Sequence, residues 1–332
     1  MSFNITVEGG SSVRLPTAGK YCDRDIVITA EGGTEDLNDV LTEQEALITE
    51  LQETLRGKAT GSGISPDDIA SAGITGDIVI NHSSIAAYAF ANNTGITSLT
   101  APNVTSVGTY AFYQTGLTGA LDLTPCKTIG AYAFCNCYGI TSLSIPNVTS
   151  VGTNAFQYCK NIERLDVPNL TTMGTYAFSG NASNQMAFKS INLPKCKAIP
   201  NSAFTYCPYV TELVLPECTS VGNSSLTNCA NLQYVDLPKC TSIVNYGLRN
   251  NGKLETLILR SEKMCTLSNS ALNSTKIWNG TGYVYMPRAL IASYQTATNW
   301  KTIYGKNANA FRALEDYTVD GTLTGELDPN KI

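Results

Sequence analysis

One six-residue phrase recurs along most of this chain at a nearly constant interval, and it restricts the fold more than any other feature. The phrase has the form Ile/Val-Gly-x-x-Ala-Phe, intact or degenerate. Its last residue falls at Phe90, Phe112, Phe134, Phe156, Phe178, Phe204, Leu226, Leu248 and Leu272. Successive positions differ by 22, 22, 22, 22, 26, 22, 22 and 24 residues. A fixed period of this length is typical of a solenoid, in which each repeat forms one turn and stacks on its neighbours.

Each repeat also contains a short alternating segment that predicts a β-strand. In Leu143-x-Ile145 both apolar residues point the same way, and Pro146 then ends the strand. Equivalent positions one period apart should form two inward columns. The first column is Leu99, Leu121, Leu143, Leu165, Ile191, Leu213, Val235, Leu257 and Val284, and the second is Leu123, Ile145, Val167, Leu193, Leu215, Leu237, Leu259 and Met286. We therefore expect one strand per turn in a parallel sheet. The single 26-residue interval predicts a bulging loop at residues 179–185.

The cysteines follow the same period. One set lies three residues after the last residue of the phrase (Cys137, Cys159, Cys207 and Cys229), and another follows the strand segment (Cys126, Cys196, Cys218 and Cys240). In other repeats the position of this second cysteine set is held by Val104, Val148 and Leu170, so it requires a small buried apolar side chain. We expect buried, reduced thiols. Oxidation between neighbouring turns is the alternative.

The chain divides into four predicted parts. Residues 1–33 read as a small β anchor segment, residues 34–60 as a coiled-coil neck, residues 61–287 as the solenoid, and residues 288–332 as a cap helix with a polar tail. The neck has apolar residues spaced by four and three, with one glutamine among them: Leu37, Leu41, Gln44, Ile48, Leu51 and Leu55. We expect these residues to join three copies in a parallel homotrimer. The alternative is an amphipathic helix that packs on its own domain.

Residues for catalysis are scarce. His82 is the only histidine and lies in a turn, so no Ser-His-Asp or Cys-His arrangement has support elsewhere. Asp122 and Asp166 would stand about 10 Å apart, near the separation of an inverting glycosidase pair, but nothing encloses a substrate there. We predict no catalytic residues, no metal ligands and no cofactor. The chain is expected to be a binding protein and not an enzyme.

Composition excludes two classes of partner. The net charge of −5 leaves no basic stripe for nucleic acid, and no run of 18 apolar residues would insert into a membrane. The first ten residues lack the basic and apolar regions of a secretory signal, so none is expected.

The outward strand positions indicate where a ligand would bind. They are small and polar in the first repeats but include tyrosines and aliphatic residues in the last. The predicted ligand-binding residues are Glu212, Val214, Tyr234, Asp236, Ile258, Tyr283 and Tyr285. Exposed aromatic residues beside acids are typical of a recognition patch. The alternative is that the C-terminal segment folds back and covers them.

Two segments resemble known families. Leu213-x-Leu215-x-x-Cys218 and the phrase Gly-x-x-Ala-Phe-x-x-Cys resemble the BspA-type (treponemal) leucine-rich repeats of bacterial surface proteins. The resemblance covers about residues 74–287. It implies an α/β leucine-rich-repeat solenoid of about nine 22-residue repeats and a role in adhesion, with no catalytic residues in the repeat.

Residues 15–29 resemble segments at the start of phage and prophage structural proteins of gut bacteria. That resemblance implies a phage tail-associated receptor-binding protein, placed in the virion or at an extracellular surface. Its partners would be a bacterial surface glycan or protein receptor and, through the N-terminal segment, other tail proteins. The alternatives are a bacterial cell-surface adhesin that binds host or matrix ligands and, from another class, an enzyme that acts on surface polysaccharide.

Overall fold

The computed structural model describes residues 75–319 continuously, residues 322–323 and 327, and three short strands near the N-terminus. These strands are β1 (Phe3–Val7), β2 (Ser11–Arg14) and β3 (Ile26–Ile28). They form a sheet in the order β2-β1-β3, with β1 antiparallel to β2 and parallel to β3. The predicted neck at residues 34–60 lies outside the described residues, so the neck and the anchoring role of the first segment stay predictions.

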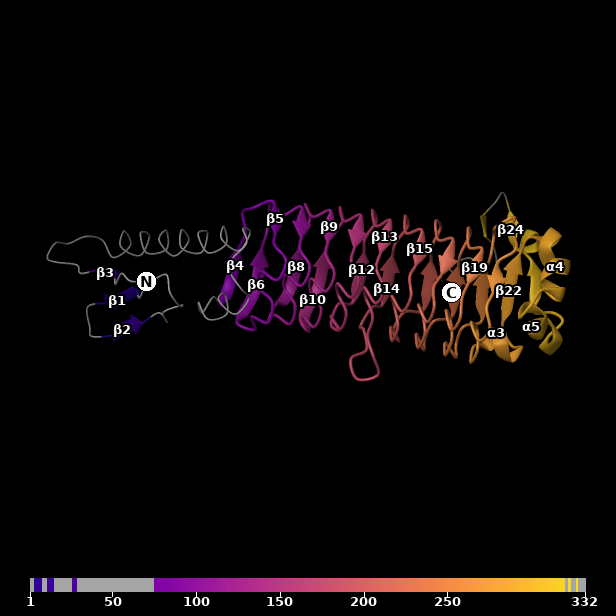
Figure 1. Cartoon of the computed structure of the whole chain (residues 1–332). Helices are drawn as coiled ribbons and strands as arrows, with labels where there is room; N and C mark the ends of the chain where they lie inside the picture. Colours follow the sequence, from indigo (N-terminus) through magenta and orange to yellow (C-terminus); the bar gives the residue numbers. More distant parts are fainter. Residues whose placement is uncertain are drawn as a thin grey trace.

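Residues 75–287 form a stack of turns, and each turn contributes two short strands where the sequence predicted one (Figure 1). The nine predicted strands are present, and one further strand, β4, precedes them. We call this row the strand face: β4 (Gly76–Val79), β6 (Ile96–Thr100), β8 (Thr118–Asp122), β10 (Gly139–Ser144), β12 (Arg164–Asp166), β14 (Ser190–Asn192), β16 (Glu212–Val214), β18 (Tyr234–Asp236), β20 (Thr256–Ile258) and β22 (Tyr283–Met286). The second row was not predicted: β5 (Ser84–Ile85), β7 (Ser106–Val107), β9 (Thr128–Ile129), β11 (Ser150–Val151), β13 (Thr172–Met173), β15 (Ala198–Ile199), β17 (Ser220–Val221), β19 (Ser242–Ile243) and β21 (Thr266–Leu267). It was missed because two residues are too few to show alternation.

Every strand pair of the stack is parallel, as predicted, and residues one period apart are in register, for example Val235 opposite Leu257. On the strand face the paired groups are β4-β6, β8-β10, β12-β14 and β16-β18-β20-β22. In the second row the ladder runs from β5 to β13 and again from β15 to β21. The break between β13 and β15 coincides with the four-residue excess, which projects as the predicted loop near residues 179–185 (Figure 1).

The stack is a solenoid of mostly β-strands, so the expected α/β class is wrong for the turns. Residues 75–275 contain no α-helix. The repeated phrase prevents one, because residues two before and two after its last position have left-handed backbone: Tyr88, Asn92, Tyr110, Gln114, Tyr132, Asn136, Asn154, Tyr158, Tyr176, Ser202, Tyr206, Ser224, Asn228, Tyr246, Asn250, Ser270 and Ser274. At Tyr110 and Gln114, for example, φ is 57° and 54°. L-residues do not propagate a helix through such positions.

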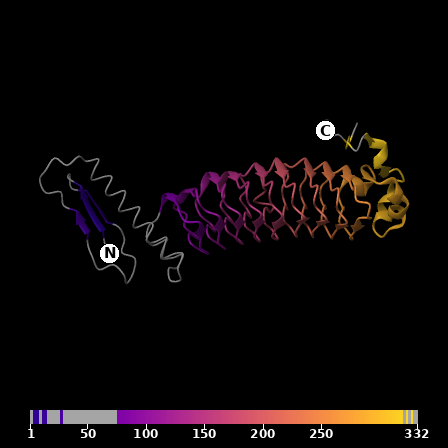
Figure 2. The same cartoon turned by 90° about the horizontal axis from the view of Figure 1, so that it is seen from above.

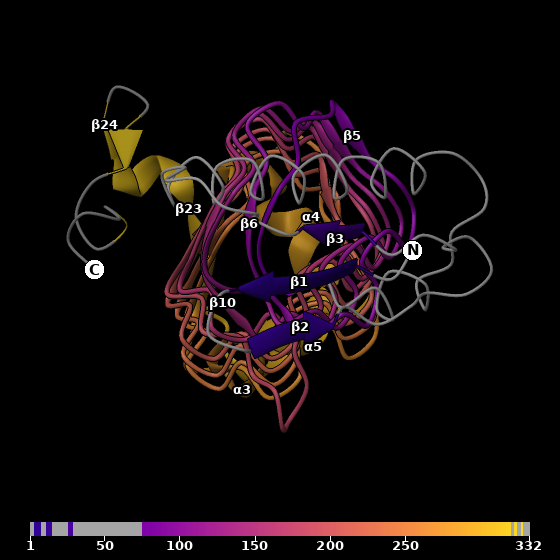
Figure 3. The ribbon, with the colours of Figure 1, turned by 90° about the vertical axis from the view of Figure 1, so that its left-hand side faces the viewer.

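A continuous column of phenylalanine rings forms the centre of the core. Neighbouring rings from Phe90 to Phe204 stack with centroids 5.2–5.6 Å apart and interplanar angles of 14° or less. Viewed along the axis, the turns of the stack superpose (Figure 3). Leucines continue it at the last three turns, and they are equally buried. A second stack, Tyr88, Tyr110 and Tyr132, has centroids 4.9 and 4.5 Å apart and serves the packing of neighbouring turns.

The glycine of the phrase permits close approach between turns. A Cβ placed on Gly152 would lie 2.5 Å from the backbone nitrogen of Ala131, and one on Gly174 would lie 2.3 Å from that of Thr153. Backbone atoms cannot yield as a flexible side chain can. The sequence therefore uses glycine where one turn contacts the backbone of the preceding turn.

Cys137, Cys159, Cys207 and Cys229 are buried and unpaired, as predicted, and the same holds for the other cysteines of residues 75–319. The thiols of the four predicted cysteines bond to backbone oxygens. Cys137 Sγ donates to Phe112 O at 3.0 Å and Cys159 Sγ to Phe134 O at 3.1 Å. Burial raises the pKa of Cys137 to about 11. A thiol with so high a pKa behaves as a small apolar side chain at neutral pH.

The C-terminal cap differs from the single helix expected after Pro287. The chain forms a short helix α3 (Lys276–Asn279) before β22, then a 3-10 turn at Arg288–Leu290, α4 (Ile291–Thr296) and α5 (Trp300–Lys306). The helix is divided because Asn299 has a φ of 66°. Strand β23 (Phe311–Ala313) then pairs with β22 and extends the sheet, while the helices close the end of the stack (Figure 2). None of the described helices is long and apolar enough to span a membrane.

Candidate ligand-binding face

The strand face changes character along the stack. From β6 to β14 its outward side chains are small, polar or charged and are mostly exposed, including Asp122, Ser144, Arg164, Asp166 and Asn192. From β18 onward the outward side chains are larger, and most of them are buried. The open part of the strand face is therefore polar, and the predicted recognition patch lies beyond it.

Exposure was wrongly predicted for most of that patch. Tyr234, Asp236, Ile258 and Tyr285 are each 2% exposed or less. Glu212 and Val214 are exposed, and Tyr283 is half-buried. The four buried residues were predicted as exposed because a strand pattern identifies outward positions but does not reveal what covers them.

The covering element is the C-terminal segment, which is the alternative given by the sequence. After β23 the chain forms a 3-10 turn at Leu314–Tyr317 and an antiparallel pair of strands, β24 (Thr318–Val319) and β25 (Thr322–Leu323). Leu323 and Leu327 pack with Tyr234, Ile258 and Tyr285 in a small apolar cluster separate from the main core. The hydroxyl of Tyr234 donates to the carbonyl of Leu327 at 3.5 Å. Figure 3 shows β24 lying to one side of the superposed turns.

The tyrosines of the patch surround a cation of the chain itself. The guanidinium carbon of Arg312 lies 3.4 Å from the ring centroid of Tyr283, and it is 5.8 and 5.9 Å from those of Tyr285 and Tyr317. Arg312 Nη1 also donates to the hydroxyls of Tyr285 and Tyr317 at 3.2 and 3.1 Å. This arrangement resembles an aromatic cage for a ligand cation, but here β23 supplies the cation.

Asp236 is held in the same region by Arg260. Arg260 Nε donates to Asp236 Oδ1 at 3.2 Å, and Arg260 Nη2 donates to Oδ2. Burial raises the pKa of Asp236 above that of a free aspartate, and the bonds from Arg260 oppose part of that rise. The carboxylate is therefore occupied within the fold.

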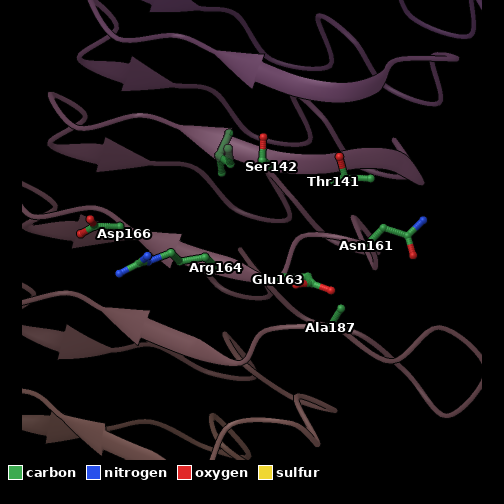
Figure 4. A pocket seen from close by; sticks show the side chains of 8 residues that line it. Thr141, Ser142, Asn161, Glu163, Arg164, Asp166 and Ala187 are labelled. Carbon is green, nitrogen blue, oxygen red and sulfur yellow. The ribbon is translucent and has the colours of Figure 1, made fainter.

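A cavity that the sequence did not predict opens on the exposed part of the strand face. It has a volume of about 640 Å³ and lies between β10 and β12, two strands that do not pair. Its lining is Thr141, Ser142, Leu143, Asn161, Glu163, Arg164, Asp166 and Ala187 (Figure 4). Leu143 is half-exposed here, whereas Leu121 and Leu165 of the same column are buried. A patch of the apolar column is therefore uncovered at the floor of the cavity.

The polar groups of this cavity are partly engaged. Glu163 pairs with Lys189 at 2.8 Å, and Asp166 Oδ1 accepts a hydrogen bond from Asn192 Nδ2 at 2.8 Å. Within residues 75–319, Arg164 has neither an ion-pair partner nor a side-chain hydrogen bond, and its side chain is exposed. Hydroxyl, amide, carboxylate and guanidinium groups thus face one recess, with donors still available.

This arrangement is suited to reversible binding. His82 is an exposed turn residue, as predicted, and lies several turns from the cavity. Asp122 Oδ1 accepts bonds from the backbone and hydroxyl of Thr124 at 2.9 and 2.5 Å, so this carboxylate is used to stabilise a turn. The described cavity brings together several hydrogen-bonding side chains on one recess of the strand face.

Two kinds of comparison, with protein families and with solved structures, relate the chain to known proteins. Residues 75–185 and 181–282 match the family described as "BspA type Leucine rich repeat region (6 copies)". No curated protein matches the sequence. Solved structures with a similar fold include a leucine rich cell surface protein from Faecalibacterium prausnitzii A2-165, at 18% identity and a TM-score of 0.39 over 57% of this chain and 60% of that one. The chain therefore spans less than two thirds of the length of that protein.

Two further structures are similar. A leucine-rich repeat protein from Eubacterium ventriosum has 17% identity and a TM-score of 0.42 over 63% of this chain and 84% of that one. The pneumococcal vaccine antigen PcpA has 12% identity and a TM-score of 0.33 over 71% and 78%. The matched repeats cover more than half of the 332 residues. With its stacked turns, its phenylalanine column and its recurrent cysteines, the chain belongs to the family of BspA-type leucine-rich-repeat proteins.

Proposed function

We propose that this protein is a non-catalytic recognition protein that attaches to a bacterial surface glycan through the exposed part of its strand face. The observation that carries the proposal is the cavity between β10 and β12, in which Arg164 is unengaged within the described structure and faces hydroxyl, amide and carboxylate groups. Residues of these types bind the adjacent hydroxyls of a sugar by paired hydrogen bonds, and charged partners make such bonds stronger.

The floor of the cavity fits the same class of ligand. Leu143 and Ala187 provide an apolar surface on which the C–H side of a sugar ring can pack, while Asn161 and Asp166 line the rim. A cavity of this volume accommodates one or two sugar residues. Weak single sites of this kind gain strength when several are presented together.

Binding of fluorescent protein to bacterial cells and to a panel of surface oligosaccharides tests the site. We expect Arg164→Ala and Asp166→Asn each to weaken binding at least about tenfold, since each removes a charge-assisted hydrogen bond. The matched control is Arg249→Ala, because Arg249 lies on a different face and contacts Tyr246. Undiminished binding by Arg164→Ala, with an unchanged circular dichroism spectrum, would contradict the proposal.

Within this function we further propose a phage or prophage tail-associated role, in which the N-terminal segment contacts other tail proteins. The support is the resemblance of residues 15–29 to phage structural proteins. A role as a bacterial cell-surface adhesin is the alternative, and it is favoured by the repeat family. Antibody labelling distinguishes the two, because the adhesin would be detected on intact cells and the tail protein on released particles.

The homotrimer belongs to the same proposal. Residues 34–60 would join three copies through the seam that begins at Leu37 and ends at Leu55, and three solenoids on one neck would bind with avidity. Light scattering on the full chain and on a chain beginning at residue 62 should give a trimer and a monomer, respectively. A monomeric full chain would refute the trimer without affecting the proposal for the cavity.

Glu212 and Val214, which are exposed on β16, are proposed to extend the ligand surface.

A further inference from the structure

Two buried cysteines on neighbouring turns lie close together near the cap. Cys240 precedes β19 and Cys265 precedes β21, and these two strands are neighbours in the second row. The two Sγ atoms are 3.9 Å apart, and both side chains are 0% exposed. Adjacent parallel strands hold their Cα atoms at a separation that a disulfide can span, so the sulfurs need to move about 2 Å to form a bond.

This geometry differs from that of Cys137 and Cys159. Cys137 and Cys159 also lie one period apart, but each thiol donates to a carbonyl of the turn before it. Those two thiols are therefore bonded to carbonyl oxygens and not to each other. In the pair near the cap, each sulfur contacts the other sulfur as well as a backbone oxygen.

Cys265 is also the residue through which the cap is attached. Its backbone N–H donates to the hydroxyl of Tyr294 in α4 at 2.7 Å, and its carbonyl accepts from Trp300 Nε1 in α5 at 2.7 Å. Both aromatic side chains are buried. Whatever fixes Cys265 to the preceding turn therefore also fixes the cap.

We propose that Cys240 and Cys265 are a redox-sensitive pair that forms a disulfide and thereby fastens the C-terminal cap to the stack. Cys240 is the attacking group. The hydrogen bond from the Cys265 thiol lowers the pKa of Cys240, and the same bond together with burial raises the pKa of Cys265. The thiolate is the nucleophilic form of cysteine.

With a peroxide as oxidant the reaction is balanced. The Cys240 thiolate attacks one oxygen of hydrogen peroxide, the O–O bond breaks, and a sulfenic acid and hydroxide form. The Cys265 sulfur then attacks the Cys240 sulfur, the S–O bond breaks, and the S–S bond forms. The departing hydroxide takes the Cys265 proton as water, and the first hydroxide takes up the proton that Cys240 lost. Two thiols and one peroxide thus give one disulfide and two waters.

The test uses the full chain, reduced and then treated with hydrogen peroxide under native conditions. Free thiols are alkylated after denaturation, and the digest is mapped by mass spectrometry. We expect the count of free thiols to fall from eleven to nine, with a cross-linked peptide that joins residues 240 and 265. The disulfide should raise the midpoint of thermal unfolding of the cap by roughly 5 °C, since it closes a loop of 25 residues.

Cys240→Ser and Cys265→Ser should each abolish the cross-link and the thermal shift, and Cys137→Ser is the matched control that should retain both. Mapping of the wild-type chain requires no variant, so a folding defect in a variant cannot obscure the result. A dominant cross-link between other cysteines, or oxidation to sulfinic and sulfonic acids without a cross-link, would overturn the proposal.

Discussion

The phenylalanine column allows the contribution of ring stacking to be separated from that of burial. Phe134 and Phe204 are both 0% exposed. Phe134 stacks on rings at both sides, with centroids 5.2 Å away, while Phe204 stacks on Phe178 at 5.6 Å and meets Leu226 on its other side. Replacement of either ring by leucine removes a similar apolar volume, and leucine is already accepted in this column at Leu226.

The two substitutions should therefore differ by one stacked pair. Phe134→Leu loses two stacked pairs and Phe204→Leu loses one, and such a pair is worth about 1 kcal/mol beyond area burial. We expect Phe134→Leu to be about 1 kcal/mol more destabilising, which is roughly 1–2 °C in the midpoint of thermal unfolding of a chain of this size. Differential scanning calorimetry of both variants and of the double variant Phe112→Leu/Phe134→Leu gives the comparison. Equal destabilisation by the two single changes would refute the argument, because burial alone would then account for the column.

Three more substitutions test other parts of the fold. Gly152→Ala should lower the free energy of unfolding by about 2 kcal/mol or more, because the added Cβ would lie 2.5 Å from the backbone nitrogen of Ala131. A Cβ added at Gly252 has no atom within 4 Å, so Gly252→Ala should change the free energy of unfolding by about 0.5 kcal/mol or less. Urea titration of both variants measures the difference. Leu165→Ala should lower the free energy of unfolding by about 2–5 kcal/mol, and Leu143→Ala should lower it clearly less, because Leu143 is half-exposed at the cavity. A larger loss for Leu143→Ala would show that Leu143 is buried and that the cavity is not open in solution. Burial raises the pKa of Asp236 in the folded chain above its value in the unfolded chain, which is about 3.9. The protonated Asp236 carboxyl therefore stabilises the fold fully below the unfolded pKa, and this contribution is lost as the pH rises through the folded pKa. Asp236→Asn should therefore make the unfolding midpoint less dependent on pH above about 4, and an unchanged pH profile would show that the carboxyl is not perturbed.

The period of the sequence determined most of the fold. Nine strands of the strand face, the inward columns, the bulge near residues 179–185 and the buried cysteines all follow from residues that return every 22 positions. The sequence did not reveal the second row of strands or the left-handed residues such as Tyr110, because both depend on backbone geometry between turns. The cap helix was divided at Asn299 for the same kind of local reason.

The candidate site was less predictable because exposure depends on contacts between distant residues. Tyr234 and Leu327 are 93 positions apart, and no periodic pattern connects them. The cavity at Arg164 has a similar origin. Its sequence, Glu163-Arg-Leu-Asp166, follows the repeat pattern, and nothing in that pattern distinguishes the unpaired strands β10 and β12 at which the recess lies.

The C-terminal segment offers a direct test of whether it covers a latent surface. Deletion of residues 320–332 removes Leu323 and Leu327, the two leucines that pack on Tyr234, Ile258 and Tyr285. Burial of two leucines contributes at most about 3–6 kcal/mol, part of which is offset by the entropy lost when the segment is ordered. The solenoid core, which includes Val235 and Leu257, does not contact these leucines in the small cluster. We therefore expect the shortened chain to remain folded while the patch becomes accessible.

Accessibility can be read from chemical nitration of tyrosine, followed by peptide mapping. Tyr234 and Tyr285 should be modified slowly in the full chain and at least about tenfold faster in the shortened chain, because each is about 1% exposed while covered. Deletion of residues 328–332 alone is the matched control, since it leaves both leucines in place. Equal nitration in all three chains would show that the segment does not cover the patch in solution. If nitration does rise, stronger binding of the shortened chain to bacterial cells would indicate that the covered tyrosines form a second ligand surface, while unchanged binding would confine recognition to the exposed part of the strand face.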